Sequence, residues 1–368
     1  MTLRNKILGV ISLLVAVALV SLALALSHDS ACGPAPALPA NAKLMKAIVY
    51  RCYGPPTVLK YEDIEKPTPA EDEVLVKVHA ASVNPLDWHY MRGTPYIVRT
   101  DSGLGAPKNP RLGVDFAGTV EAVGKNVTSF KPGDEVFGGK TGAFAEYVTV
   151  REKRALVLKP ANVTFEQAAS VPIAAITALQ ALRDNGRIQP GQKVLINGAS
   201  GGVGTFAVQI AKSFGAEVTG VCSTRNVPMV QSIGADHVID YTQEDFTKSG
   251  QRYDLILDAV GSHSLSEYRH VLTPKGILVI VGGPSYGQWI GPMVTAIKAL
   301  VLSKFVSQSI VPFLAELKKE DLTTLRDLMQ SGKVTPVIDK RYKLSEVPAA
   351  LAYLEEGHAR GKVVINLE

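Results

Sequence analysis

A glycine-rich turn between an apolar run and the start of a helix constrains this chain more than any other feature. Residues 193–197 read Lys-Val-Leu-Ile-Asn, which is typical of a buried strand, and Gly198, Gly201 and Gly204 follow at three-residue spacing. Such glycines permit a tight turn and a close approach of backbone to phosphate, and the helix N-terminus adds free N–H groups. Ala199 replaces the first glycine of the usual Gly-x-Gly-x-x-Gly pattern. The segment predicts a site for a dinucleotide pyrophosphate, with a purely structural turn as the alternative.

The end of the next apolar strand favours NADPH over NADH. Residues 217–222 form this strand, and Ser-Thr-Arg-Asn follows at 223–226. An NAD site usually has a carboxylate here that accepts from the ribose 2′-hydroxyl, but no Asp or Glu occurs between Val218 and Gly234. Ser223 and Arg225 can instead bind a 2′-phosphate, unless Arg225 is simply a solvated loop cation.

Two further apolar runs complete the pattern of this half. They span residues 253–258 and 276–281, and both lead into glycines. Strands that alternate with helical segments predict an α/β fold, a Rossmann-type doubly wound parallel sheet with its ligand at the carboxyl ends of the strands.

The N-terminus carries a long uncharged segment. Residues 7–26 contain no charge and follow Arg4 and Lys6, and about 20 apolar residues suffice to cross a bilayer. We predict a transmembrane anchor over residues 1–27, with a cleaved signal peptide as the alternative. Residues 28–43 are rich in Pro and Ala and predict a semi-rigid linker that holds the folded part away from the membrane.

Charge and cysteine content exclude several classes. The net charge of +5 with no Lys/Arg run does not favour nucleic acid. Cys32, Cys52 and Cys222 lie far apart in sequence, so we expect neither a disulfide framework nor a metal knuckle. The cations before the apolar segment favour a body outside the cytoplasm, whereas Lys43, Lys46 and Arg51 weaken that preference. Because nicotinamide cofactor is abundant in the cytoplasm, we expect a single-pass membrane protein with its catalytic domain on that side.

Short alternating strands with Gly and Pro turns between residues 45 and 150 predict a partly open β-barrel. Several motifs occur at matching spacing: Asn-Pro-Leu-Asp at 84–87, Gly-Val-Asp-Phe-Ala-Gly at 113–118, Lys-Pro-Gly-Asp at 131–134 and the glycine turn. With these motifs the chain resembles the medium-chain dehydrogenase/reductase superfamily, in its zinc-free quinone oxidoreductase branch. The tail at 357–366 is similar to the reticulon-interacting mitochondrial NADPH oxidoreductases.

The resemblance implies a domain organisation. Residues 44–170 would form a GroES-like catalytic domain, completed by about 310–368, and residues 171–309 an NADP-binding Rossmann domain. A homodimer is implied as well.

The chain departs from the zinc-dependent relatives at the metal site. Where those enzymes supply a Cys and a Gly-His-Glu, this chain has Ser82 to Asn84 and Gly113-Val-Asp115, and the four-cysteine lobe is missing. Three N or S ligands cannot be assembled, so we expect no metal. Hydride delivery to an acceptor that is already electron-poor, such as a quinone or an α,β-unsaturated carbonyl, is then the expected chemistry.

The resemblance also implies site residues. Asn84 would lie near the nicotinamide and donate to the developing oxyanion, while Asp87 ties down the local backbone. Thr177 would contact the nicotinamide. Tyr96 is a loose match to a proton donor, with loop packing as its alternative role. On the cofactor side, the residues implied are Ser200, Gly201, Gly202, Val203 and Gly204 at the pyrophosphate, Ser223, Arg225 and Tyr241 at the 2′-phosphate, Val260 and Gly282 at the nicotinamide half, and Arg360 and Lys362 near the phosphates. The alternatives are a buried strand-end aromatic for Tyr241 and surface charges for Arg360 and Lys362.

Residues 289–317 are unusually apolar, which predicts an apolar entrance to the substrate site or, equally, a dimer interface. Together with the anchor, an apolar entrance suggests a lipophilic acceptor. The leading hypothesis is an NADPH-dependent quinone or enone reductase, and the alternative is a membrane-tethered NADPH-binding scaffold or sensor with little catalysis.

Overall fold

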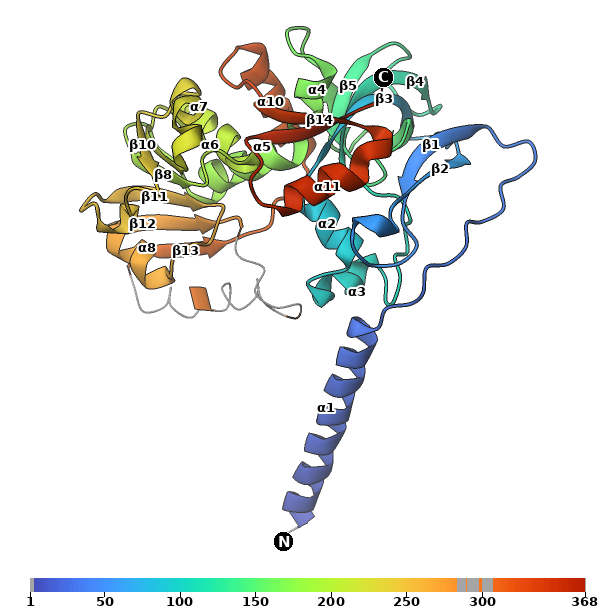
Figure 1. The fold of residues 1–368 in the computed structure, drawn as a ribbon, viewed down its shortest axis with the longest axis horizontal. Coiled ribbons are helices and arrows are strands. Elements are labelled where there is room, and N and C mark those ends of the chain that lie inside the picture. Colours follow the sequence, from blue (N-terminus) through green and yellow to red (C-terminus); the bar gives the residue numbers. More distant parts are fainter. Residues whose placement is uncertain (1–2, 283–288, 290–297, 300–306, 368) are drawn as a thin grey trace.

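The computed structural model describes residues 3–282, 289, 298–299 and 307–367. It begins with α1 (Leu3–Ser27), which projects from the folded body (Figure 1). Within the described residues, α1 is the one helix that is long and apolar enough to cross a membrane. A signal sequence has the same property. Of the predicted apolar segment 289–317, residues 290–297 and 300–306 lie outside the described residues.

The cofactor half is a six-stranded parallel sheet, as predicted. Its strand order is β10-β9-β8-β11-β12-β13. The strands are β8 (Lys193–Asn197), β9 (Glu217–Cys222), β10 (His237–Asp240), β11 (Tyr253–Asp258), β12 (Leu272–Ile280) and β13 (Ser309–Pro312). The helices of this half are α5 (Pro172–Gln180), α6 (Gly202–Ser213), α7 (Val227–Ser232) and α8 (Leu265–Val271). Since β13 pairs with β12, this half extends a few residues past the expected boundary at 309.

The catalytic half is built on a seven-stranded sheet. Its order is β14-β15-β3-β4-β5-β7, with β6 paired to β3. The strands are β3 (Glu73–Val83), β4 (Asp115–Val123), β5 (Glu135–Gly139), β6 (Tyr147–Arg151), β7 (Leu156–Leu158), β14 (Ile338–Lys343) and β15 (Lys362–Asn366), beside a separate pair, β1 (Leu44–Val49) and β2 (Lys60–Glu65). Its helices are α2 (Pro85–Arg92), α3 (Arg99–Ser102), α4 (Phe165–Ala169), α10 (Lys319–Gln330) and α11 (Val347–Glu355).

The C-terminal strand β15 pairs antiparallel with β3, so the end of the chain completes the first domain. Val364 faces Ser82 in this register. The consequence is that Gly361 and Lys362, at the start of β15, lie beside the end of β3 and the motif that follows it.

The expected linker is docked for part of its length instead of free. The Ser30 N–H donates to the Gly105 carbonyl at 2.9 Å, and Cys32 forms a disulfide with Cys52. The expectation of no disulfide was therefore wrong: the chain folds back so that the two Cα atoms, 20 residues apart in sequence, lie 4.6 Å apart.

Candidate active site

The glycine turn forms the junction that the sequence predicted between β8 and α6. Gly198 has φ of +86°, a left-handed conformation that favours glycine. A Cβ on Gly204 would lie 2.0 Å from the Gly198 carbonyl oxygen, so the turn requires glycine for close packing. A Cβ on Gly201 would instead meet that oxygen at 3.4 Å. The backbone at Gly201, the residue before α6, is therefore open toward the expected pyrophosphate, with Ser200, Gly202 and Val203 beside it partly exposed.

A buried asparagine behind this turn suits a polar ligand. The Asn226 Nδ2 group donates to the Ser200 hydroxyl at 3.0 Å and to the Ser223 hydroxyl at 3.1 Å. Its Oδ1 atom is buried and accepts no hydrogen bond within the described chain. Both hydroxyls accept from the amide, so their own hydrogens are available to phosphate oxygens. The residues present fit a dinucleotide.

Two arginines meet where the adenosine end is expected. The Arg225 guanidinium donates to the His358 carbonyl at 3.2 Å, and the Arg360 guanidinium lies 3.5 Å from the Arg225 carbonyl. Both side chains are exposed, as is Tyr241. The structure thus brings the end of β9 together with the loop before β15.

Val260 and Gly282 follow adjacent strands and lie at the same edge of the sheet. A Cβ on Gly198 would come within 2.7 Å of a Val260 methyl group, and one on Gly282 within 2.5 Å of the Ala259 carbonyl oxygen. Val260 therefore lies over the glycine turn, on the side where the nicotinamide half is expected.

Asn84 caps helix α2 and is almost completely buried. Its backbone N–H donates to Asp87 Oδ2 at 2.7 Å, which confirms that Asp87 ties down the local backbone. The Asn84 Nδ2 group donates to Asp115 Oδ2 at 2.9 Å and reaches the Ser82 carbonyl at 3.5 Å. One amide hydrogen is thus firmly held, and the other has only a long contact.

Lys362 lies at the glycine turn with only part of its side chain. Its stem passes the turn, where Cδ is 3.3 Å from the position of a Cβ on Gly202. Its ammonium is buried and donates to Asn84 Oδ1 at 2.6 Å and to the Val83 carbonyl at 3.2 Å. A surface charge is therefore not its role, and its charge is directed into the catalytic domain.

Asp115 is a site residue that the sequence reasoning assigned no role. Its Oδ2 atom lies 3.6 Å from Lys362 Nζ and also accepts from the Ser82 hydroxyl at 3.2 Å. Its Oδ1 atom accepts from the Ile173 N–H in the first turn of α5, the helix that carries Thr177. The Thr177 hydroxyl donates to the Ile173 carbonyl at 2.7 Å, which leaves its lone pairs to accept. The sequence feature that could have identified Asp115 is its position, because this acid replaces the glutamate in the Gly-His-Glu of the zinc-dependent relatives.

Burial dominates the electrostatics of this cluster. Desolvation raises the pKa of Asp87 to about 7 and raises the pKa of Asp115, against the opposing effect of Lys362. Desolvation likewise lowers the pKa of Lys362, which the carboxylates partly oppose. A buried ammonium balanced by buried acids is the outcome.

Tyr96 lies at the opposite rim, in the short helix Tyr96–Val98. Its ring packs edge-on against Trp289 with centroids 4.8 Å apart, and the Arg99 guanidinium lies 4.6 Å from its centroid. Packing therefore accounts for much of its environment, and its role as an acid stays a prediction.

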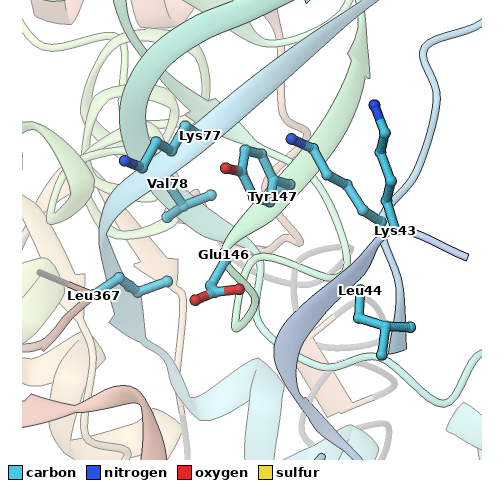
Figure 2. Close-up of a pocket in the computed structure, with 8 residues that line it drawn as sticks. Lys43, Leu44, Lys77, Val78, Glu146, Tyr147 and Leu367 are labelled. Carbon is cyan, nitrogen blue, oxygen red and sulfur yellow. The ribbon is translucent and has the colours of Figure 1, made fainter. Parts of the chain in front are cut away.

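Within the described ranges, no cluster of three or more His, Cys, Asp or Glu side chains is arranged to hold a metal ion. A separate hollow of about 420 Å³ lies among β1, β3 and β6 and includes none of the predicted site residues (Figure 2). Its lining includes Lys43, Lys77, Glu146 and Tyr147.

A parallel nucleotide-binding sheet whose glycine turn abuts a second, β-rich domain defines a two-domain nicotinamide-dependent oxidoreductase. Residues 70–161 match the alcohol dehydrogenase GroES-like domain, and residues 233–365 match a model described as a zinc-binding dehydrogenase. The chain belongs to the medium-chain dehydrogenase/reductase superfamily, in its zinc-free quinone oxidoreductase branch.

Three similar proteins illustrate this placement. The NADPH-dependent alkenal/one oxidoreductase of Arabidopsis thaliana chloroplasts is 37% identical over 88% of this chain and 80% of its own. The human mitochondrial NAD(P)H oxidoreductase RTN4IP1 is 36% identical over 88% of this chain and 89% of its own. The structure of the quinone oxidoreductase from Coxiella burnetii superposes with a TM-score of 0.77 at 32% identity, covering 89% of this chain and all of that one.

Proposed function

We propose that the protein uses NADPH to reduce quinones or α,β-unsaturated carbonyl compounds without zinc. One junction carries the proposal. The Gly361 N–H donates to the Ser200 carbonyl at 2.8 Å, and the next residue, Lys362, donates to Asn84 Oδ1 at 2.6 Å. Neighbouring residues thereby hold the pyrophosphate turn against the catalytic motif. The names of the relatives support the same reaction class.

When bound, NADPH supplies a hydride from its nicotinamide, and the acceptor gains this hydride and one proton. The protein must orient the pair and stabilise the oxyanion that develops on the acceptor. The second hydrogen of Asn84 Nδ2 has only a 3.5 Å contact with the Ser82 carbonyl, so it is the hydrogen available to donate to that oxygen. Thr177, whose hydroxyl already donates to Ile173, can accept from the nicotinamide carboxamide.

The choice of NADPH rests on the adenosine end. Arg225 and Arg360 lie together there, and Ser223, not a carboxylate, follows the strand β9. Two guanidinium groups attract a 2′-phosphate and leave a 2′-hydroxyl without its usual acceptor. Tyr241 lies exposed beside them after β10.

For enones, we propose Tyr96 as the proton donor after hydride transfer. Quinones do not require it, because water can protonate the product. A Tyr96→Phe variant should therefore lose enone activity and keep quinone activity, whereas an equal loss for both acceptors would assign Tyr96 to packing.

We further propose that α1 is a retained single-pass anchor and that the acceptor is lipophilic. Arg99, almost fully buried, donates to the carbonyls of Leu26 and His28 at 3.0 Å each and pairs with Asp29 at 2.8 Å. The end of α1 is thus bound to Arg99 at the start of α3, next to the short helix that carries Tyr96 (Figure 1). Cleavage before residue 30 would remove these three partners and leave the buried cation with the Gly93 carbonyl.

The same segment supports a proposal for the side of the membrane. The disulfide between Cys32 and Cys52 favours an oxidising compartment, and Arg4 and Lys6 before the helix favour the same orientation. Both features favour a catalytic domain outside the cytoplasm. They oppose the cytoplasmic side that was expected from the supply of nicotinamide cofactor. Two relatives are named as a chloroplast and a mitochondrial protein, and these locations concern organelles of those species.

The deciding experiment measures NADPH and NADH oxidation by the full chain in detergent, with a small quinone and a small enone. A truncated variant without most of α1 is measured beside it. This variant should delete residues 1–24 only, because a chain that starts at Lys43 would lack Cys32 and Asp29. Turnover with a preference for NADPH supports the proposal. Tight NADPH binding without turnover on either acceptor would favour a tethered NADPH-binding scaffold.

A further inference from the structure

The most unusual charge in the catalytic half is the Lys362 ammonium. Lysine is almost never fully buried without a partner, yet this side chain is only 3% exposed. It donates to Asn84 Oδ1 and to the Val83 carbonyl, and lies 3.6 Å from Asp115 Oδ2. The cation is therefore aimed at the candidate catalytic amide.

Asp115 completes the arrangement from the other side of that amide. Its Oδ2 atom accepts from Asn84 Nδ2 at 2.9 Å, while Lys362 donates to Asn84 Oδ1. One group at each end excludes a flipped amide, because a flip would direct the NH₂ group at the ammonium and the oxygen at the carboxylate. The orientation of Asn84 is fixed by two charges.

A second buried lysine shows what a structural pair looks like. Lys159 is also mostly buried and pairs with Glu135 at 2.9 Å, but Glu135 is half exposed. Lys159 also donates to the carbonyls of Pro160 and Val163 in its own loop. This pair fastens a surface turn, whereas both members of the Lys362–Asp115 pair are buried and share one amide.

We propose that Lys362 is a positioning residue that polarises the Asn84 amide for hydride transfer, a fixed cation in place of a metal ion. An ammonium bonded to the amide oxygen withdraws electron density from the amide and strengthens its N–H as a donor. In a low-dielectric site this matters most when negative charge builds on the acceptor oxygen. Asp115 keeps the amide in register and balances the charge.

This inference rests on the proposed reductase function and predicts a dependence on the acceptor. A weak electrophile relies on oxyanion stabilisation more than a strong one. Removing the cation should therefore slow weak acceptors more than strong acceptors, whereas a general loss of fold or of cofactor binding slows all of them by one factor.

The test uses the full chain with Lys362→Met and Asp115→Asn combined, so that the ammonium and its paired carboxylate are removed together. Kinetics follow a series of quinones and enones ordered by reduction potential, with deuterated NADPH to verify that hydride transfer is observed. We expect about a 10- to 100-fold loss in kcat for the weakest acceptors, by analogy with the loss when a group that orients a metal ligand is removed, and a smaller loss for the strongest. NADPH affinity should change little. Asp115→Asn alone, which keeps the cation, should retain the wild-type dependence on the acceptor.

Lys159→Met is the matched control for loss of a buried lysine and should leave kcat unchanged. If the double variant does not fold, Lys362→Gln with Asp115→Asn keeps a neutral donor and serves instead. A uniform loss across the series, or no loss, would overturn the inference while leaving the reductase function intact. Absence of turnover in the wild type would refute the proposed function itself.

Discussion

The two sides of the candidate active site are assembled in different ways. The cofactor side is dominated by residues close in sequence, since Gly198 to Gly204 form one turn and Ser223 to Asn226 the next. The acceptor side joins Asn84, Asp115 and Lys362 from three different strands or strand ends, and its rim is fastened by Arg99 to the end of α1. A local turn can be recognised from its own residues, whereas a site made by distant segments depends on the whole fold.

The strongest test of the acceptor side is Arg99→Met. Arg99 donates to three backbone carbonyls, of Gly93, Leu26 and His28, and pairs with Asp29. Asp29 is mostly exposed, so the main cost of removing the guanidinium falls on the carbonyl oxygens that lose their donor, about 1–3 kcal/mol for each one that stays buried. We expect a loss of this size in the free energy of unfolding, measured by denaturant titration of the full chain in detergent.

Arg92→Met is the control, because Arg92 pairs with Glu355 near the surface and such pairs contribute about 0–1 kcal/mol. Equal effects of the two variants would mean that the contact with the end of α1 adds no stability.

Asp87 makes the acceptor side sensitive to pH. Burial raises its pKa from 3.8 to about 7, so between these values the folded protein keeps a proton that the unfolded chain has lost. This contribution to stability is complete below pH 3.8 and is lost as the pH rises through 7. Asp87→Asn should therefore gain up to about 4 kcal/mol relative to wild type between pH 4 and 8, about 1.4 kcal/mol for each pH unit of the shift.

The measurement is the difference in unfolding free energy between the two proteins across that range. The exposed Asp101→Asn variant, altered in the same domain, should run parallel to wild type. A constant difference between Asp87→Asn and wild type would show that Asp87 is ionised throughout.

The cofactor side can be tested with two glycines of one turn. A Cβ on Gly204 would meet the Gly198 carbonyl oxygen at 2.0 Å, and a Cβ on Gly201 would meet it at 3.4 Å. Gly204→Ala should cost about 1–3 kcal/mol of stability without any ligand, as overpacking does. Gly201→Ala should leave stability near wild type and weaken NADPH binding, because its Cβ occupies the open side of the turn. Thermal unfolding and NADPH titration separate the two effects. Reversed results would mean that the pyrophosphate does not bind on the Gly201 side of the turn.

These contrasts show how far the sequence could predict the site. The glycine turn and the end of β9 follow from spacing and residue type, and both lie as expected. The sequence could not predict the Cys32–Cys52 disulfide, the contacts of Arg99 or the direction of Lys362, because each depends on chain segments brought together by the fold. Lys362 is instructive: its stem does lie at the glycine turn, but only the pairing of β15 with β3 directs its charge toward Asn84.

The smallest expected effect concerns the choice of cofactor. Arg225 is exposed and bonded only weakly to the His358 carbonyl, so Arg225→Ala should not alter the fold. Loss of a charge-assisted bond to a 2′-phosphate should raise the KM for NADPH about tenfold, near 1.4 kcal/mol, and leave the KM for NADH unchanged. Lys248→Ala, which removes an exposed cation next to Asp245 in the same domain, should change neither constant. Because NADH lacks the 2′-phosphate, an equal change with both cofactors would mean that Arg225 contacts a part they share, and the assignment of the β9 end to the 2′-phosphate would fail.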